Sequence, residues 1–359
     1  MNLERFGWDD FFASGFGTYA AEGFEPARVI LQHNKIYLLQ TEAGETQGET
    51  SGRLRHLARG PEELPAVGDW VAIRRRPERA SATIHAVLPR RSKFSRLAAG
   101  TRNEEQVVAA NVDTVFLVVG LDNDFNPRRV ERYLITAWES GARPVVVLNK
   151  ADLTPEAEER RREVERVAPG ADVVLMSAKR DDALEEIAPF VEPRKTVAFV
   201  GSSGVGKSTI VNRLVGAEVQ KTREVRASDE RGQHTTTHRE LLLLPSGALI
   251  IDTPGMRELQ LLVSERGMRE TFEDIEGLAS ECRFGDCRHE EEPDCAVREA
   301  LSTGALDAER YANYRKMRQE MQHLAARQDP RAAREEKERA KRLSRAANDA
   351  VKQKQKRKS

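Results

Sequence analysis

The stretch VVVLNKADL, residues 145–153, decides the fold when it is set beside GSSGVGKST, residues 201–209. In the first stretch an N-K-x-D motif follows directly on four apolar residues, as at the end of a buried strand. In the second, a G-x-x-x-x-G-K-S motif follows another apolar run. The N-K-x-D motif comes roughly 50 residues before the glycine-rich motif, and this order governs the interpretation of the whole chain.

Five apolar runs predict the strands of a parallel sheet. They are nearly continuous, as in strands buried on both faces, and polar helical stretches such as 131–141 and 156–168 lie between them. The pattern predicts a doubly wound α/β domain, in which ligands bind beyond the carboxyl ends of the strands. The five runs cover residues 112–120, 143–150, 171–179, 195–201 and 248–255.

The glycine-rich motif has the context of a phosphate-binding loop, because it follows a strand and opens a helix. Its glycines let the backbone turn tightly and direct N–H groups at phosphate oxygens, and the helix N-terminus adds favourable dipole charge. Lys207 is expected to bridge the β- and γ-phosphates, and the Ser208 hydroxyl to ligate Mg²⁺. The predicted phosphate-binding residues are Gly201, Ser202, Ser203, Gly204, Val205, Gly206, Lys207, Ser208 and Thr209.

The stretch ALIIDTPG supplies a second group for the metal. The Asp252 carboxylate is predicted to hold Mg²⁺ through water, and the N–H of Gly255 to contact the γ-phosphate. On its own D-T-P-G is compatible with an ordinary turn, since proline and glycine both favour turns. The phosphate loop in the same domain favours metal binding, so Lys207, Ser208 and Asp252 are the predicted catalytic residues.

The N-K-x-D motif predicts that the base is guanine. Asp152 can accept hydrogen bonds from guanine N1–H and N2–H₂, which adenine does not offer, and such a site rejects the wrong base by about 10⁴-fold. Alone the motif is weak, because a helix entry through Asp152 would look similar. A second segment, S-A-K, follows the next apolar run and offers a backbone N–H to guanine O6. The predicted guanine-binding residues are Asn149, Lys150, Ala151, Asp152, Ser177, Ala178 and Lys179.

The order of the motifs is rotated relative to an ordinary GTPase, in which the phosphate loop comes first and the base-reading loops last. Here the order is N-K-x-D, S-A-K, phosphate loop, a polar segment and D-T-P-G. A doubly wound sheet allows this because its termini can be moved on the surface without changing which strand ends surround the ligand. The sequence therefore predicts a circularly permuted GTPase domain.

The polar segment between the phosphate loop and D-T-P-G is predicted to be a long functional loop. Within it Thr236 is favoured as the residue that senses Mg²⁺ and the γ-phosphate. Met256 follows D-T-P-G where many GTPases carry a glutamine that orients the attacking water, and a thioether cannot do this, so hydrolysis by the protein alone is expected to be slow. His234 is a candidate to position the water; the alternative is that it only packs or caps the loop.

Residues 1–103 are predicted to form a small β-barrel of the OB type. Short alternating runs at 27–40, 53–59, 68–76 and 82–91 are separated by turn residues. A basic rim then follows and includes one aromatic residue. It favours a platform for RNA, but a solvated arginine-rich turn explains it equally well. The rim consists of Arg90, Arg91, Lys93, Phe94 and Arg96.

All three cysteines of the chain fall between residues 282 and 295, with a histidine among them. Three thiolates and one imidazole complete the closed tetrahedral set of a structural Zn²⁺, although the spacing C-x₄-C-x-H-x₅-C is not that of the familiar fingers. The alternative is a group of exposed free thiols. The predicted zinc ligands are Cys282, Cys287, His289 and Cys295.

The C-terminal part is predicted to be helical and then basic. An apolar stripe within residues 299–326 is interpreted as core that packs against the zinc unit. Residues 331–359 hold twelve basic and four acidic side chains and almost no apolar ones. Such a tail is either an anchor for RNA phosphates or a general solvated tail, and alone it is expected to be disordered or a solvated helix.

The rotated motif order, the N-terminal barrel and the Cys/His cluster after D-T-P-G together resemble the small-ribosomal-subunit-dependent GTPases of the RsgA or YjeQ family, over nearly the whole chain. The resemblance implies a GTPase that acts in late maturation of the bacterial small (30S) subunit and is stimulated by that subunit. It also implies rRNA binding through the barrel and the C-terminal region, and it supports the zinc assignment. The segment RGQHTTT resembles the family's Gly-x-His-Thr-Thr pattern.

The predicted organisation has four parts: an OB-type barrel over 1–103, a circularly permuted GTPase domain over 104–277, a helical zinc-binding domain over 278–329 and a basic tail over 330–359. The 58 basic and 58 acidic residues balance, so net charge indicates no partner. No apolar run approaches the ~18 residues of a membrane span, and the N-terminus lacks a signal-peptide pattern. We expect a cytoplasmic monomer that binds GTP or GDP, Mg²⁺, one Zn²⁺ and the small subunit with its rRNA, and no membrane.

The role of the nucleotide is open between classes of function. In one alternative the chain is an RNA-binding scaffold, in which GTP is only a structural switch and turnover is incidental. In another it is a GTPase that acts on a different RNA or protein assembly. Only 27 residues separate Gly255 from Cys282, so the nucleotide state is expected to shift the zinc unit relative to the barrel.

Overall fold

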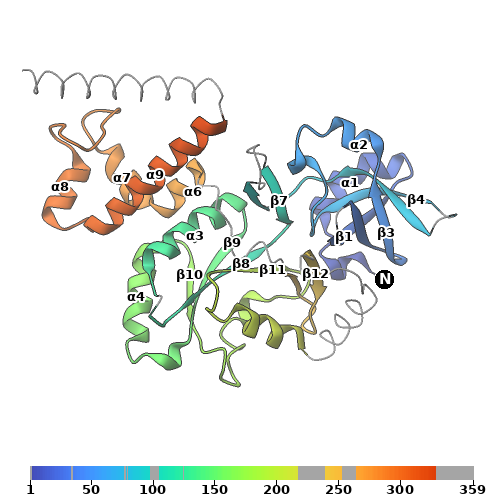
Figure 1. Cartoon of the computed structure of the whole chain (residues 1–359), viewed down its shortest axis with the longest axis horizontal. Helices are drawn as coiled ribbons and strands as arrows, with labels where there is room; N and C mark the ends of the chain where they lie inside the picture. The colour runs from blue at the N-terminus through green and yellow to red at the C-terminus, as the bar shows by residue number, and fades with distance from the viewer. Residues whose placement is uncertain are drawn as a thin grey trace, which may run out of the picture.

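A computed structural model of the chain describes residues 2–33, 35–76, 78, 80–97, 105–123, 125–216, 239–252 and 264–328. Figure 1 shows an N-terminal barrel at one side, an α/β domain in the middle and a helical unit at the other side. His234, Thr236, Gly255 and the basic tail lie outside the described residues. Within the described part, no helix is both long enough and apolar enough to cross a membrane.

The central domain is built on the parallel sheet that the apolar runs predict. Its strands lie in the order β10-β9-β8-β11-β13, and an antiparallel strand, β12, follows β13. Every residue of β8 and β11 is buried, because helices and loops cover both faces of the sheet. The strands are β8 (Thr114–Gly120), β9 (Arg143–Asn149), β10 (Asp172–Leu175), β11 (Thr196–Val200), β12 (Arg239–Leu243) and β13 (Leu249–Asp252).

Helices α3 (Pro127–Ser140) and α4 (Ala157–Val167) confirm the two helical stretches expected between the strands. Asn126 caps α3 by accepting a hydrogen bond from the Arg128 N–H, and Gly141 ends the helix in the left-handed conformation. A further helix begins at Lys207, directly after the glycine-rich loop. Single 3₁₀ turns are η1 (Leu3–Phe6), η2 (Pro61–Glu63), η4 (Ala151–Leu153) and η5 (Ala188–Phe190).

The N-terminal strands close into the five-stranded barrel that the sequence predicts. They lie in the order β1-β2-β3-β5-β4, and β4 pairs back to β1, so that no edge is left open between them. Trp70, Ile73 and Ile84 are completely buried inside. The strands are β1 (Glu25–His33), β2 (Ile36–Thr41), β3 (Gly44–Thr50), β4 (Trp70–Arg76) and β5 (Ser81–Val87), and α1 (Asp10–Ala21) packs against β1 and β4.

One predicted strand of the barrel is wrong. The run at 53–59 lies in helix α2 (Gly52–Leu57) and the loop after it, with Ser51 as the N-cap that accepts a hydrogen bond from Leu54 N–H at 3.0 Å. Leu54 and Leu57 are three residues apart, which places them on one face of a helix but on opposite faces of a strand. The third barrel strand is instead β3, whose polar sequence GETQGET carries little hydrophobic signal.

The barrel and the α/β domain are joined into one continuous sheet. Strand β1 pairs antiparallel with β12, with Leu31 opposite Glu240, and a separate pair is formed by β6 (Lys93–Leu97) and β7 (Glu105–Ala110). The buried Arg28 guanidinium donates to the Phe6 and Gly68 carbonyls and to the Thr196 hydroxyl at 2.8 Å. Burial lowers the Arg28 pKa to about 10. These bonds tie the N-terminal segment, the barrel and the α/β domain together.

The helical unit has its own hydrophobic core and includes two helices that precede the cysteine cluster. The core contains Met268, Phe272 and Ile275 together with Cys295, and it extends onto Ile135 of α3. The expected boundary at residue 277 falls inside α7, so we propose that this unit begins at residue 264. Its helices are α6 (Glu265–Thr271), α7 (Glu273–Ser280), α8 (Ala296–Thr303) and α9 (Ala308–Gln328).

Candidate nucleotide-binding site and metal centre

The predicted nucleotide-binding residues gather at one edge of the parallel sheet. The last residues of β9, β11 and β13 are Asn149, Val200 and Asp252, and the S-A-K segment begins two residues after β10 ends. Because parallel strands end at the same edge, motifs that lie as much as 100 residues apart in the chain become neighbours. This is the position at which doubly wound sheets bind ligands.

Asn149 connects the three loops that the sequence assigns to the nucleotide. Its side chain is 2% exposed. Its Nδ2 donates to the Val205 carbonyl in the glycine-rich loop at 2.8 Å, and its Oδ1 accepts from the Ala178 N–H at 2.8 Å. One amide therefore fixes the glycine-rich loop and the S-A-K segment to the end of β9, so the base-reading and phosphate-reading parts form one unit.

Lys150 is held by an acid that sequence reasoning missed. Its backbone is left-handed, with φ 67°, and its Nζ lies 2.5 Å from Asp122 Oδ2. Asp122 follows β8 by two residues and therefore lies at the same edge of the sheet. The signal was present in the sequence, since a carboxylate just beyond an apolar run that borders the N-K-x-D strand is a natural partner for its lysine. The ion pair orients the lysine stem.

Asp152 is exposed, and its carboxylate is held in one orientation. The Ser177 hydroxyl donates to Asp152 Oδ1 at 2.5 Å, and the Ala151 N–H donates to the Met176 carbonyl at 3.1 Å. The hydrogen bond from Ser177 lowers the pKa of Asp152 below its usual value. The group is thus ionised at neutral pH, as an acceptor of two N–H donors must be.

The glycine-rich loop wraps around the ammonium group of Lys207. Lys207 Nζ donates to the Gly201 carbonyl at 2.6 Å and also to the Ser202 carbonyl, and the side chain is 7% exposed. Ser208 and Thr209 follow in the first turn of the helix. Gly204 and Gly206 have φ of 80° and 99°, which only glycine adopts without strain. The loop has the shape of a backbone cradle for an anion.

Replacing Gly206 by alanine is expected to destabilise the folded chain by more than the left-handed strain of about 1–3 kcal/mol. A Cβ at this position would lie 2.2 Å from Asn149 Nδ2, so the amide that joins the three loops would be displaced. Thermal unfolding of the nucleotide-free protein measures the effect. Gly204→Ala is the matched control, because its φ is also positive but a Cβ there meets no atom within 4 Å. Equal losses in the two variants would contradict the role given to Asn149.

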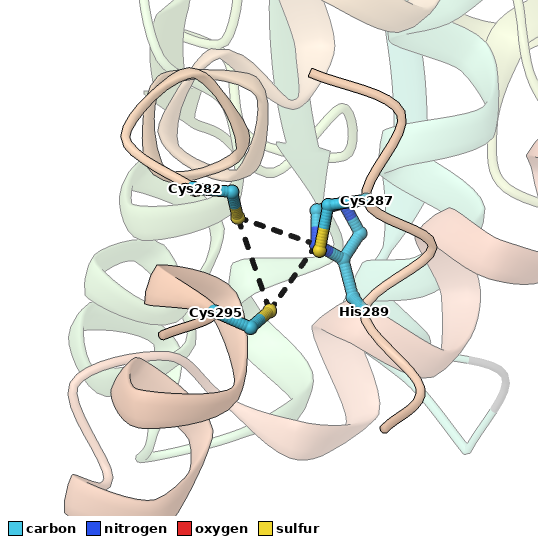
Figure 2. Close-up of side chains that lie close together, drawn as sticks. All are labelled: Cys282, Cys287, His289 and Cys295. Carbon is cyan, nitrogen blue, oxygen red and sulfur yellow. Dashed lines mark hydrogen bonds between the residues drawn. The ribbon is translucent and has the colours of Figure 1, made fainter. Parts of the chain in front are cut away.

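Cys282, Cys287, His289 and Cys295 point toward one another, as Figure 2 shows. Cys282 Sγ lies 3.8 Å from Cys295 Sγ, and His289 Nδ1 lies 3.6 and 3.4 Å from these two sulfurs. Zinc bonds of about 2.3 Å to sulfur and about 2.0 Å to nitrogen require edges of about 3.5–3.8 Å in a tetrahedron. The four side chains therefore fit a Zn²⁺ ion. Burial also lowers the pKa of His289, which favours the neutral imidazole that binds metals.

The elements that present the four ligands all belong to the helical unit. Cys282 comes two residues after α7 ends, Cys295 is the N-cap of α8, and Cys287 and His289 lie in the loop between them. Cys295 is also part of the apolar core of this unit. Four protein ligands complete a tetrahedral ion, so a Zn²⁺ ion held here would have no open position and would be structural.

The cations of the basic rim all pair with polar side chains of the protein, and Arg91 and Lys93 keep 35% and 46% of their side chains exposed. Each of its four cationic side chains has a polar partner in the barrel or in β7, and Phe94 is 1% exposed. The Arg90 partner, Asp69, is itself completely buried. The rim residues therefore hold the barrel to the rest of the chain. The pairs are Arg90 with Asp69 at 2.7 Å, Arg91 with Asp9 at 2.6 Å, Lys93 with Glu105 at 2.8 Å and Arg96 with Gln106 at 3.2 Å.

Comparison with known families and proteins agrees with this geometry. The model of the RsgA GTPase family matches residues 87–262. A protein named small ribosomal subunit biogenesis GTPase RsgA from Opitutus terrae is 52% identical over 352 residues, which cover 96% of each chain. The chain belongs to the RsgA GTPase family. A relative with the same name from Syntrophotalea carbinolica is 46% identical over 329 residues, which cover 89% of this chain and 90% of the relative.

Two solved structures share the arrangement of the RsgA-family chain. YjeQ from Thermotoga maritima has a TM-score of 0.61 at 28% identity, over 83% of this chain and 98% of that one. YloQ, described as a circularly permuted GTPase, has a TM-score of 0.57 at 27% identity, over 84% of this chain and 96% of that one. These likenesses confirm the fold class expected from the rotated motif order.

Proposed function

We propose that this chain hydrolyses GTP to GDP and phosphate in the biogenesis of the small ribosomal subunit, and that the subunit stimulates the reaction. The RsgA relatives carry that role in their names. The observation that carries the chemistry is the Asn149 side chain, which joins the N-K-x-D loop to both the glycine-rich loop and the S-A-K segment. Because ribosomal subunits are assembled in the cytoplasm, the proposed activity is cytoplasmic.

The residues divide into a base-reading group and a phosphate-reading group. Asp152 accepts the guanine N–H donors, and Lys150, oriented by Asp122, covers the base with its stem. Lys207 and the backbone N–H groups of residues 201–209 neutralise and orient the phosphates. The groups act together because one edge of the sheet carries both.

Mg²⁺ would be held by Ser208 and Asp252, with Thr236 and the Gly255 N–H as further contacts at the γ-phosphate. Strands β11 and β13 are adjacent and parallel, so Asp252 at the end of β13 lies beside the strand that leads to the loop containing Ser208. A hydroxyl and a carboxylate are the ligands that this ion takes in such sites. When bound, Mg²⁺ neutralises the charge that develops on the phosphate oxygens.

Slow hydrolysis by the chain alone follows from Met256 in the place of a water-orienting glutamine. His234 is proposed to position the attacking water. Exposed cations of the barrel, together with the C-terminal tail, are proposed to contact rRNA. They include Arg53 and Arg55 on α2 and Arg76 on β4. Burial lowers the pKa of His85, and the charges of Arg74, Arg76 and Arg53 lower it further.

Turnover of GTP and ATP by the purified chain, with and without small ribosomal subunits at two salt concentrations, tests the proposal. We expect slow turnover of GTP alone and a rise of about 10²-fold or more with subunits, as when transition-state stabilisation comes from a partner. High salt should abolish the rise in turnover, because contacts between cationic side chains and RNA phosphates weaken as the salt concentration rises. GTP-dependent binding to subunits without added turnover would favour the scaffold alternative, and a response only to another assembly would reject the ribosomal assignment.

A further inference from the structure

Two side chains of helix α3 contact the phosphate loop through one serine. Arg129 Nη1 donates to Ser202 Oγ at 3.0 Å, and the Tyr133 hydroxyl shares a hydrogen bond with the same oxygen at 3.1 Å. The two residues are four apart, so they lie on one face of a helix with about 3.6 residues per turn. Ser202 is the second residue of the loop, and its own carbonyl is one of the two that hold Lys207.

Another face of α3 carries the helical zinc unit. Glu131 is completely buried and accepts hydrogen bonds from Arg310 at 2.6 Å and from Asn313 at 2.5 Å, both on α9. Arg310 is 4% exposed and also binds Asp274 of α7 at 2.7 Å. Burial works against its charge, but the hydrogen bonds and charges of Asp274 and Glu131 outweigh this and raise the pKa of Arg310. The Glu131–Arg310 ion pair is therefore an anchor between the α/β domain and the helical zinc unit.

The packing around the anchor leaves no room for the two units to slide. A Cβ on Gly267 of α6 would lie 2.1 Å from the Ile135 carbonyl of α3, so the two backbones are in direct contact. At the rim of this interface, Arg128 pairs with Asp307 at 2.6 Å and Arg132 with Glu320 at 2.9 Å. A displacement of the zinc unit must therefore either carry α3 with it or break a buried ion pair.

We propose that Arg129 and Tyr133 are positioning residues for the phosphate loop, and that the zinc unit sets their position through the Glu131–Arg310 anchor on the same helix. Helix α3 is the element that both partners share: one face holds Ser202 and the other holds α9. When the zinc unit is displaced by its partner, α3 moves Ser202 and with it the carbonyls that hold Lys207. This inference rests on GTP hydrolysis as the activity of the site, and it adds the route by which another domain reaches that site.

The loop end of this route is tested by the dissociation rate of a fluorescent GDP analogue from Arg129→Gln and Tyr133→Phe. Each variant removes one hydrogen bond to Ser202, so we expect each to change the rate by about 2- to 10-fold. In a Ser202→Ala background the same substitutions should have almost no further effect, because their shared partner is gone. Arg162→Gln, an exposed cation on the neighbouring helix α4, is the matched control and should leave the rate unchanged.

The zinc-unit end is tested with Asp307→Asn and Glu320→Gln combined, which loosens the rim of the interface while the buried anchor keeps the unit folded. We expect this double variant to shift GDP dissociation by about 2- to 5-fold in the wild-type background and to have no effect in Ser202→Ala. A lower melting temperature with unchanged dissociation would show a merely structural role and overturn the inference.

The outcomes separate this inference from the proposed function. A chain that subunits stimulate, but in which the dissociation rates do not respond to the α3 variants, keeps the proposed function and loses this inference. Conversely, dissociation rates that respond as expected in a chain that subunits never stimulate would retain the α3 route and reject the ribosomal role.

Discussion

An Asp152→Asn variant is expected to bind GTP about 10⁴-fold more weakly than the wild-type chain, because a site built for hydrogen bonds rejects a mismatched partner on this scale. The asparagine amide would place N–H donors against the N1–H and N2–H₂ donors of guanine, and one of its oxygens would be lost as an acceptor. Weak ATP binding should not fall further, since adenine has no such donors. Titration with fluorescent GTP and ATP analogues measures both.

Ser177→Ala is the matched control for this prediction. It keeps the carboxylate and removes only the 2.5 Å hydrogen bond from the Ser177 hydroxyl, so GTP affinity should fall by about 10-fold or less. That bond lowers the Asp152 pKa, so binding is present above this pKa and lost as pH falls through it. Without the bond, the loss of GTP binding should begin at a higher pH. If Ser177→Ala were as damaging as Asp152→Asn, the carboxylate would not be the group that reads the base.

The central domain could be predicted because its strands are buried on both faces. Continuous apolar runs such as residues 114–120 and 143–149 have no polar face, so only a parallel sheet covered on both sides can accommodate them. The motifs then lie at strand ends, and parallel strands bring those ends to one edge. The rotated order of the motifs therefore predicts the fold class, and the YloQ and YjeQ structures confirm it.

The parts that the sequence left open depend on contacts between distant residues. Tyr133 and Ser202 are 69 residues apart, so no local pattern links them. The role of the basic rim was left open for the same reason, since Asp69, the partner of Arg90, lies in a different loop, directly before β4. The residues of the short helix α2 were wrongly predicted to form a strand, although Leu54 and Leu57 have the spacing of one helix face.

The cysteine cluster could be predicted from the sequence in part. Its composition and compactness in the sequence indicated a metal centre, and the structure brings the four ligand atoms within 4.8 Å of one another. The sequence could not show that α6 and α7 belong to the same unit as the cysteine cluster. The alternation of polar and apolar residues in these two helices resembles that of the preceding domain. The shared core of Met268, Ile275 and Cys295 settles where they pack.

A Cys295→Ser variant is expected to lose bound zinc and to unfold the helical unit, the second large effect that the structure predicts. Structural zinc contributes about 10–16 kcal/mol at neutral pH in small domains, far more than the core of a unit of this size can supply. Zinc content by mass spectrometry should fall from one ion per chain toward none. Far-UV circular dichroism should show helix loss. Arg283→Gln is the matched control in the same loop: it breaks an exposed ion pair with Asp294 at 2.8 Å, so it should keep the zinc and cost less than about 1 kcal/mol.

The same variant distinguishes a structural zinc ion from one that binds at the surface without stabilising the fold. Because the thiolates must be deprotonated to bind, zinc in the wild-type chain should also be lost as pH falls, and helix content should fall with it. Since Cys295 shares a core with residues that pack on α3, unfolding of this unit removes the packing on Ile135 and the hydrogen-bond partners of Glu131. We therefore expect the melting temperature of the GTPase domain to fall as well. Full helix content in a zinc-free Cys295→Ser chain would contradict the structural role of the metal.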